Sequence, residues 1–147
     1  KNEFLLVYKI YFSTKHLLNN KYRMKSKILN LLLITTSLFG YLEWGGGNHS
    51  FLYEAEAEFL SKLFASPGSV FHPLTILPFV GQLLLLVSLF QKEPCKVLSY
   101  IGMAGTGILL VFMFVVGLLS LNFKIVLSTL PFLIVLILAW RHHRTRA

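Results

Sequence analysis

Four long runs of apolar residues divide the chain, covering residues 28–44, 74–90, 97–121 and 125–140. A helix rises about 1.5 Å per residue and the hydrocarbon layer of a bilayer is about 30 Å thick, so runs of this length are typical of transmembrane helices. The last three runs are joined by very short connections, which favours antiparallel neighbours. The pattern predicts an all-α membrane protein, a compact bundle of four transmembrane helices.

Basic residues gather at the ends of these runs, and lysine and arginine are retained on the cytoplasmic side of a membrane. Counted from Met24, one set of ends carries seven of them and the opposite set carries two. We therefore expect a multi-pass protein of a cell membrane, of the bacterial inner-membrane type, with both termini cytoplasmic. The richer set is Lys25, Lys27, Lys92, Lys96, Arg141, Arg144 and Arg146, and the poorer set is Lys62 and Lys124.

The first 23 residues differ in character from the rest. They are rich in Lys, Asn, Tyr, Phe, Ile and Leu, the residues that A/T-rich codons encode, and Met24 follows them, opening a short basic segment before an apolar run. We predict that residues 1–23 are translated upstream sequence or a disordered basic segment, and that 24–147 form a single four-span domain. The alternative is a real amphipathic segment on the membrane surface. The first apolar run could also be a cleaved signal peptide.

A polar stretch of about 29 residues separates the first two runs and holds three of the six acidic residues, and a fourth, Glu43, lies at the end of the first run. Gly45 to Gly47 interrupt the first helix, Asn48 or Ser50 can cap a new one, and the acids that follow suit its positive end. The spacing places apolar and charged residues on opposite faces. We expect an extracytoplasmic amphipathic helix, ended by "SPG" at 66–68.

Two glutamates, one in this stretch and one at the end of the first run, are candidate functional groups. Glu56 points into the apolar arc of the expected helix, between Phe59 and Leu60, where an unpaired carboxylate must find a partner, bind a proton or reach water. We favour the interpretation that the helix is short or displaced and that Glu56 stays in water. Glu43 lies beside Tyr41 and Trp44, a pattern typical of the membrane interface, which we favour over a functional role.

The third run contains "SYIGMAGTG", with small residues at Gly102, Gly105 and Gly107. Small residues let helices approach closely, so we interpret these glycines as a packing surface toward another span or another subunit, in preference to a ligand groove. Gln82 is interpreted as an amide bonded across to a neighbouring helix. Spans two to four contain no acid or base deep inside, which argues against a proton-coupled pump.

Composition narrows the function classes. The chain has 147 residues, 55% of them apolar, a mean hydropathy of +0.67 and one cysteine, Cys95, which excludes an internal disulfide and a CxxC redox pair. The basic residues behind the net charge of +8 lie at the ends of apolar runs and form no stripe typical of nucleic-acid binding, so no nucleic-acid partner is expected.

His49 and His72 flank the outer helix without a metal-binding motif, so neither a metal nor another cofactor is expected. His142 and His143 are interpreted as lipid headgroup contacts.

The sequence contains no catalytic signature. The order of short spans, with an amphipathic segment after the first, resembles the DoxX-like group of small bacterial membrane proteins in layout only, and no motif assigns a residue by that resemblance. Our leading hypothesis is a non-enzymatic accessory or assembly subunit, with the lipid bilayer and other membrane subunits or copies of itself as partners. The alternative is a small transporter or channel component that uses Glu56 and Glu43.

Overall fold

The computed structural model describes residues 2–45, 47–65, 73–92 and 95–145, and most of them are helical. The element order is α1 (Asn2–Leu38), β1 (Tyr41–Trp44), β2 (Asn48–Phe51), α2 (Leu52–Ala65), α3 (Pro73–Phe90), α4 (Lys96–Leu119) and α5 (Phe123–Arg144). Helices α3, α4 and α5 closely match the last three predicted apolar runs, because each run is apolar throughout and ends at polar or turn-forming residues.

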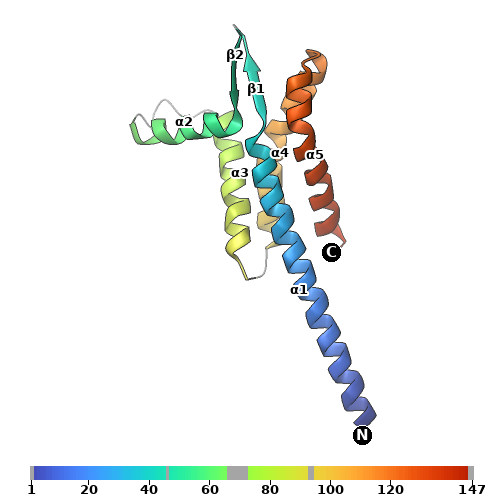
Figure 1. Ribbon diagram of the computed structural model, residues 1–147. Coiled ribbons are helices and arrows are strands. Elements are labelled where there is room, and N and C mark those ends of the chain that lie inside the picture. The colour runs from blue at the N-terminus through green and yellow to red at the C-terminus, as the bar shows by residue number, and fades with distance from the viewer. Residues whose placement is uncertain (1, 46, 66–72, 93–94, 146–147) are drawn as a thin grey trace.

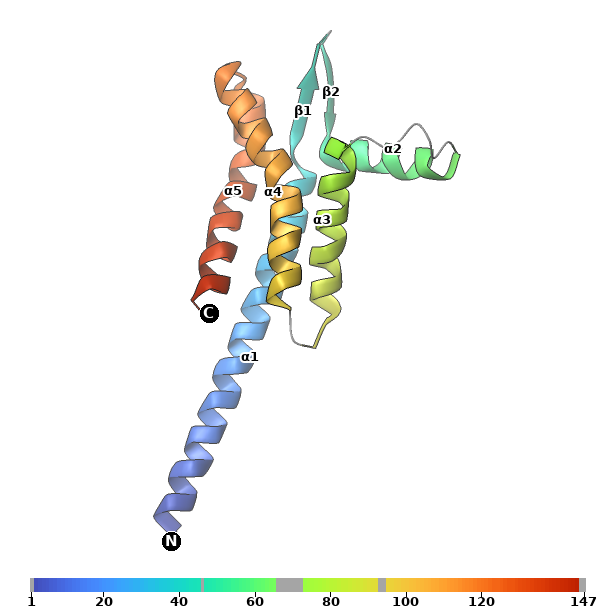
Figure 2. The ribbon, with the colours of Figure 1, turned by 180° about the vertical axis from the view of Figure 1, so that it is seen from behind.

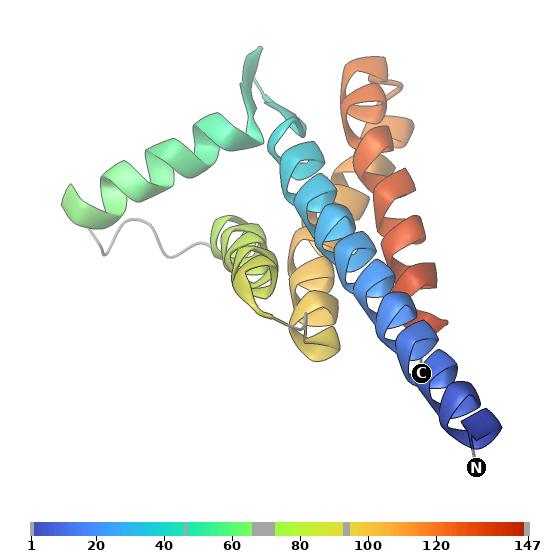
Figure 3. The ribbon, with the colours of Figure 1, turned by 60° about the horizontal axis from the view of Figure 1, so that its bottom comes forward.

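Helices α1, α3, α4 and α5 pack side by side and are called the helical core below (Figure 1). Helix α3 lies against α4, α4 against α5, and α1 lies across the front between α3 and α5 (Figure 3). Viewed from behind, α4 stands between α3 and α5 (Figure 2). The main apolar cluster includes Leu33, Leu85, Leu110 and Phe132, all of them fully buried.

The core has two distinct ends. The start of α1, the end of α3, the start of α4 and the end of α5 lie toward one end, called the terminal end (Figure 1). The two strands and the turn between α4 and α5 lie at the other, called the hairpin end. Helix α2 projects sideways from the hairpin end, next to the top of α3.

The first predicted span is wrong at its C-terminal end. Helix α1 stops at Leu38, and β1 pairs antiparallel with β2 in the register Tyr41 with Phe51 and Trp44 with Asn48. Gly45 and Gly47 lie in the turn between the strands, and Gly47 has a φ of +76°, the left-handed conformation that a hairpin loop uses. The glycines therefore close a hairpin instead of only interrupting a helix.

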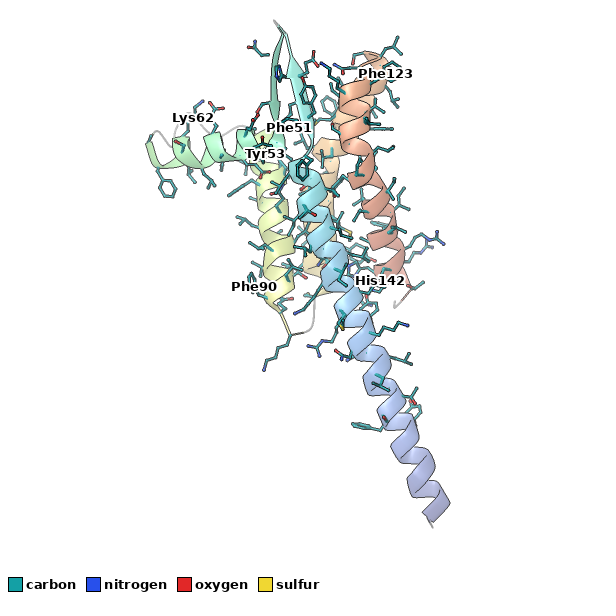
Figure 4. The ribbon with its side chains drawn as sticks, viewed as in Figure 1. Phe51, Tyr53, Lys62, Phe90, Phe123 and His142 are labelled. Carbon is teal, nitrogen blue, oxygen red and sulfur yellow. The ribbon has the colours of Figure 1, made fainter. Side chains whose placement is uncertain are left out.

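Residues 2–23 belong to α1 and continue it toward the terminal end, beyond the rest of the core (Figure 1). Tyr22 is already in contact with the core, since its ring stacks on His142 of α5 with centroids 4.3 Å apart. The sticks in Figure 4 show His142 on the lower part of α5, beside α1.

Two helices in the described part of the chain, α4 and α5, are long and apolar enough to cross a membrane, and Ile76–Phe90 of α3 forms a shorter apolar helix. The apolar half of α1 is shorter than its predicted span, because the strand β1 takes its last residues. Large apolar side chains on the outside of α4 and α5 are exposed, including Ile108, Phe112, Leu127 and Ile137.

Candidate functional site

A cavity of about 250 Å³ lies at the hairpin end, and we call it the hairpin-end cavity. Its walls come from β1, the first turns of α2, the second half of α4 and the start of α5. They are apolar except for two carboxylates, so the site joins the two candidate glutamates of the sequence. The lining residues are Tyr41, Leu42, Glu43, Leu52, Ala55, Glu56, Leu109, Phe112, Met113, Val116 and Ile125.

The start of α2 places Glu56 in this cavity. Glu54 accepts hydrogen bonds from the backbone N–H of Phe51, 2.9 Å away, and from the hydroxyl of Ser50, 3.0 Å away. A glutamate that reaches back in this way satisfies a free donor at the helix N-terminus. Leu52 is buried, and its N–H donates to the carbonyl of Gly40 at 2.8 Å. These contacts fix the first turn, and Glu56 faces inward one turn later.

The predicted caps at Asn48 and Ser50 are wrong, because both residues belong to β2. Figure 4 shows Phe51 and Tyr53 on either side of the junction between β2 and α2, where the chain changes direction. The hydrogen bonds from Phe51 and Ser50 hold the pKa of the Glu54 carboxyl below its usual value. The predicted end of this helix at "SPG" lies outside the described residues.

Glu56 is buried, with 6% of its surface exposed. Its Oε1 atom has no hydrogen-bond partner among the described residues, and its side chain forms a hydrogen bond with Gln82 of α3. Burial raises the pKa of Glu56 to about 7, and the bond to Gln82 opposes that rise. The interpretation that Glu56 stays in water is therefore wrong. Its side chain points inward, as its position in the helical pattern indicated.

Gln82 connects the cavity to the helical core. Its Nε2 atom donates to the hydroxyl of Ser37 on α1 over 3.0 Å, and both side chains are buried. The expected bond from this amide to a neighbouring helix is therefore present. The same amide thus joins α1, α2 and α3 at one point.

Glu43 is exposed and stands at the edge of the cavity. Its Oε2 accepts a hydrogen bond from the side-chain amide of Asn122, 2.7 Å away. Asn122 also caps α5, since its Oδ1 accepts from the N–H of Lys124 at 3.2 Å. Glu43 therefore ties the hairpin to the turn between α4 and α5, whereas Oε1 of Glu56 has no partner among the described residues.

Lys62 does not approach Glu56. It forms an ion pair with Glu58 one turn earlier on the exposed face of α2, with Nζ 2.6 Å from Oε1. Figure 4 shows Lys62 on the projecting part of that helix. The charged face and the apolar face of the predicted amphipathic helix are thus separate, and the buried carboxylate lies on the apolar one.

The three glycines of α4 have different neighbours. A Cβ on Gly102 would lie 2.9 Å from the carbonyl oxygen of Gly81 on α3, and a Cβ on Gly105 would lie 3.0 Å from the Cα of Gly81. A Cβ on Gly107 would meet only Leu136 of α5, at an ordinary 3.5 Å. Gly102 and Gly105 thus serve the approach of α3 to α4 within the chain. Gly81, which the sequence analysis did not single out, is their counterpart.

A second polar cluster joins three helices closer to the terminal end. The amide nitrogen of Asn30 on α1 donates to Ser88 of α3 at 3.2 Å and to Ser99 of α4 at 2.9 Å. The two serine hydroxyls are 3.1 Å apart, and all three side chains are buried. We did not predict this cluster from the sequence, although a lone Asn near the start of an apolar run is a signal for it.

The described residues contain no group of three or more His, Cys, Asp or Glu side chains that could hold a metal ion. His49 lies on the exposed hairpin, and His72 lies outside the described residues. His143 is buried near Tyr22, so its interpretation as a headgroup contact is wrong. His142 is half-buried and lies 3.1 Å from the hydroxyl of Ser26.

Comparison with known proteins gives no family for this arrangement. No protein-family model, curated protein or solved structure matches the chain.

Proposed function

We propose that this chain is a small, non-enzymatic integral membrane protein that acts as a transporter or channel component, with the hairpin-end cavity as its working site. One observation carries the proposal: Oε1 of the buried Glu56 has no partner among the described residues and belongs to a side chain that lines an apolar cavity. A buried carboxylate without a cation is costly, and such groups in membrane proteins mark the paths of ions and solutes.

The membrane setting is supported by the outer surface of the core. Exposed apolar residues cover the outside of α4 and α5. Monomeric soluble proteins rarely expose a continuous apolar surface of this kind. We infer that α3, α4, α5 and the apolar part of α1 cross the bilayer. The terminal end carries most of the basic residues, which favours the cytoplasmic side for it and the extracytoplasmic side for the hairpin-end cavity.

Flux through reconstituted vesicles tests this function. The vesicles enclose a pH-sensitive dye and receive an imposed pH gradient, and K⁺, Na⁺ or n-butylammonium is added outside in separate runs. We expect at least one of these conditions to discharge the gradient faster with the wild-type protein than in protein-free vesicles, and Glu56→Gln to abolish the difference. Glu58→Gln is the matched control, because Glu58 is exposed and lies outside the cavity. Equal rates for the wild type and Glu56→Gln under every condition would refute the function.

A second candidate is an accessory or assembly subunit, and a groove between α4 and α5 favours it. The groove is apolar, encloses about 530 Å³, and contains Ala104 and Gly107 on the α4 side. Small residues in such a groove allow close approach of a helix from another subunit or a second copy. Gly107→Leu would fill it without displacing α3. A smaller complex in mild detergent would support this function, and an unchanged size would contradict it.

A further inference from the structure

We infer that the hairpin-end cavity binds an apolar molecule with a single positively charged group, of the alkylammonium class, whose charge lies against Glu56. The inference rests on the proposed working site and names the class of its ligand. Three observations carry it. They are the composition of the walls, the difference in burial and hydrogen bonding between the two carboxylates, and the position of Phe112.

The residues that line the cavity determine the sign of the ligand's charge. Glu43 and Glu56 are the only charged side chains among the lining residues, and no Lys, Arg or His is among them, although the whole chain has a net charge of +8. An anion would meet two carboxylates without a compensating base. A neutral apolar molecule would fill the space but leave the buried carboxylate unpaired, which is costly.

The two carboxylates differ in a way that limits the ligand to one charge. Glu43 is exposed and already accepts a hydrogen bond from Asn122 at 2.7 Å. Glu56 is buried, and its Oε1 has no partner within the described residues. An ammonium group brings three donors and no acceptor, so it can satisfy Oε1 and keep donors for a neighbouring acceptor.

The rest of the cavity suits a hydrocarbon body. Apart from the two glutamates, the lining side chains are aliphatic, aromatic or thioether groups. A volume of about 250 Å³ is slightly smaller than the pockets of about 300 to 1,000 Å³ that hold drug-sized ligands. Phe112 lines both this cavity and the groove between α4 and α5, so a chain too long for the cavity can continue along that apolar groove.

Binding to the full-length protein in nanodiscs of zwitterionic lipid at pH 8 tests the inference. The probes are n-octylammonium, n-octanoate, n-octanol and methylammonium, and empty nanodiscs correct for partition into lipid. We expect n-octylammonium to bind the wild type and Glu58→Gln at least tenfold more tightly than it binds Glu56→Gln. The other three probes, which lack either the positive charge or the apolar body, should bind at least tenfold more weakly to the wild type.

A second variant separates loss of the carboxylate from loss of the fold. Ala55 lines the cavity and is half-buried, so Ala55→Phe fills the space while keeping Glu56. We expect it to lose n-octylammonium binding and to keep the thermal stability of the wild type within a few degrees. Equal affinity of n-octylammonium for the wild type and Glu56→Gln, or equal affinity of the wild type for n-octanol or methylammonium, would overturn the inference.

The outcome is separable from that of the flux experiment. If protons or K⁺ pass through the wild type but n-octylammonium shows no preference for it, the transport function stands and the ligand class is wrong. If n-octylammonium binds through Glu56 but no condition produces flux, the ligand class stands and the transport function is wrong.

Discussion

Gly81 of α3 and Gly105 of α4 are so close that a Cβ on Gly105 would lie 3.0 Å from the Cα of Gly81. A Cβ on Gly81 itself would lie 2.7 Å from the backbone nitrogen of Thr106. The opposing atoms belong to the backbone, so they cannot rotate away as a flexible side chain does. The contact between α3 and α4 therefore depends on the absence of a side chain at these positions.

The first prediction concerns this contact. Gly81→Ala should force α3 and α4 apart and lower the free energy of unfolding by about 1 to 3 kcal/mol, the usual cost of overpacking. Thermal unfolding of the purified protein in mild detergent measures the effect. Gly107→Ala is the matched control on α4, because its Cβ would make only an ordinary contact with Leu136. Equal stability of the two variants would show that the helices do not meet at Gly81.

The second prediction concerns the buried amide of Asn30. Asn30→Ala removes the hydrogen bonds to Ser88 and Ser99 and leaves a void where three helices meet, so it should cost about 1 to 3 kcal/mol. Thr35→Ala on the same helix is the control, since the Thr35 hydroxyl is exposed and bonds only to its own helix. The control should change stability by less than about 0.5 kcal/mol. An equally small change for Asn30→Ala would argue against the cluster.

The third prediction concerns orientation in the membrane. In a Cys95→Ser background, Asn48→Cys at the tip of the hairpin should react with an impermeant thiol reagent added to intact cells. Ala147→Cys should react only after the cells are opened, because the proposed orientation places that basic end in the cytoplasm. Labelling of Ala147→Cys alone in intact cells would reverse the proposed orientation.

The sequence was sufficient to predict an element where one physical signal dominates. Long apolar runs predicted α3, α4 and α5, and the alternation of charged and apolar residues predicted α2 with Glu56 on its apolar face. The hairpin at 41–51 was missed, because four-residue strands have too little periodicity to compete with the apolar run before them. Its residues Trp44 to Asn48 read "WGGGN", in which the glycines are the one turn signal.

Contacts between distant segments could not be predicted from the sequence. The approach of Gly81 to Gly102 and Gly105 depends on how α3 and α4 face each other, and spacing along one helix does not specify its partner. The burial of Glu56 likewise depends on the angle at which α2 leaves β2, which Glu54 and Leu52 fix through their contacts with Phe51 and Gly40. Local pattern gave the direction of the carboxylate but not its surroundings.

Burial raises the pKa of Glu56 from 4.5 to about 7. The folded protein therefore holds this proton more tightly than the unfolded chain does. Its contribution to stability is complete below about pH 4.5, falls as the pH rises toward 7 and changes little above that. By linkage, the stability lost between pH 4.5 and pH 8 is about 3 kcal/mol.

The decisive measurement is the free energy of unfolding from pH 4 to pH 9 for the wild type, Glu56→Gln and Glu58→Gln. Gln mimics the protonated carboxyl, so Glu56→Gln should match the wild type near pH 4.5 and exceed it by about 2 to 3 kcal/mol at pH 8. Glu58→Gln should follow the wild type throughout, because Glu58 is exposed. Three superimposable curves would show that Glu56 is in water and would contradict the cavity as the working site.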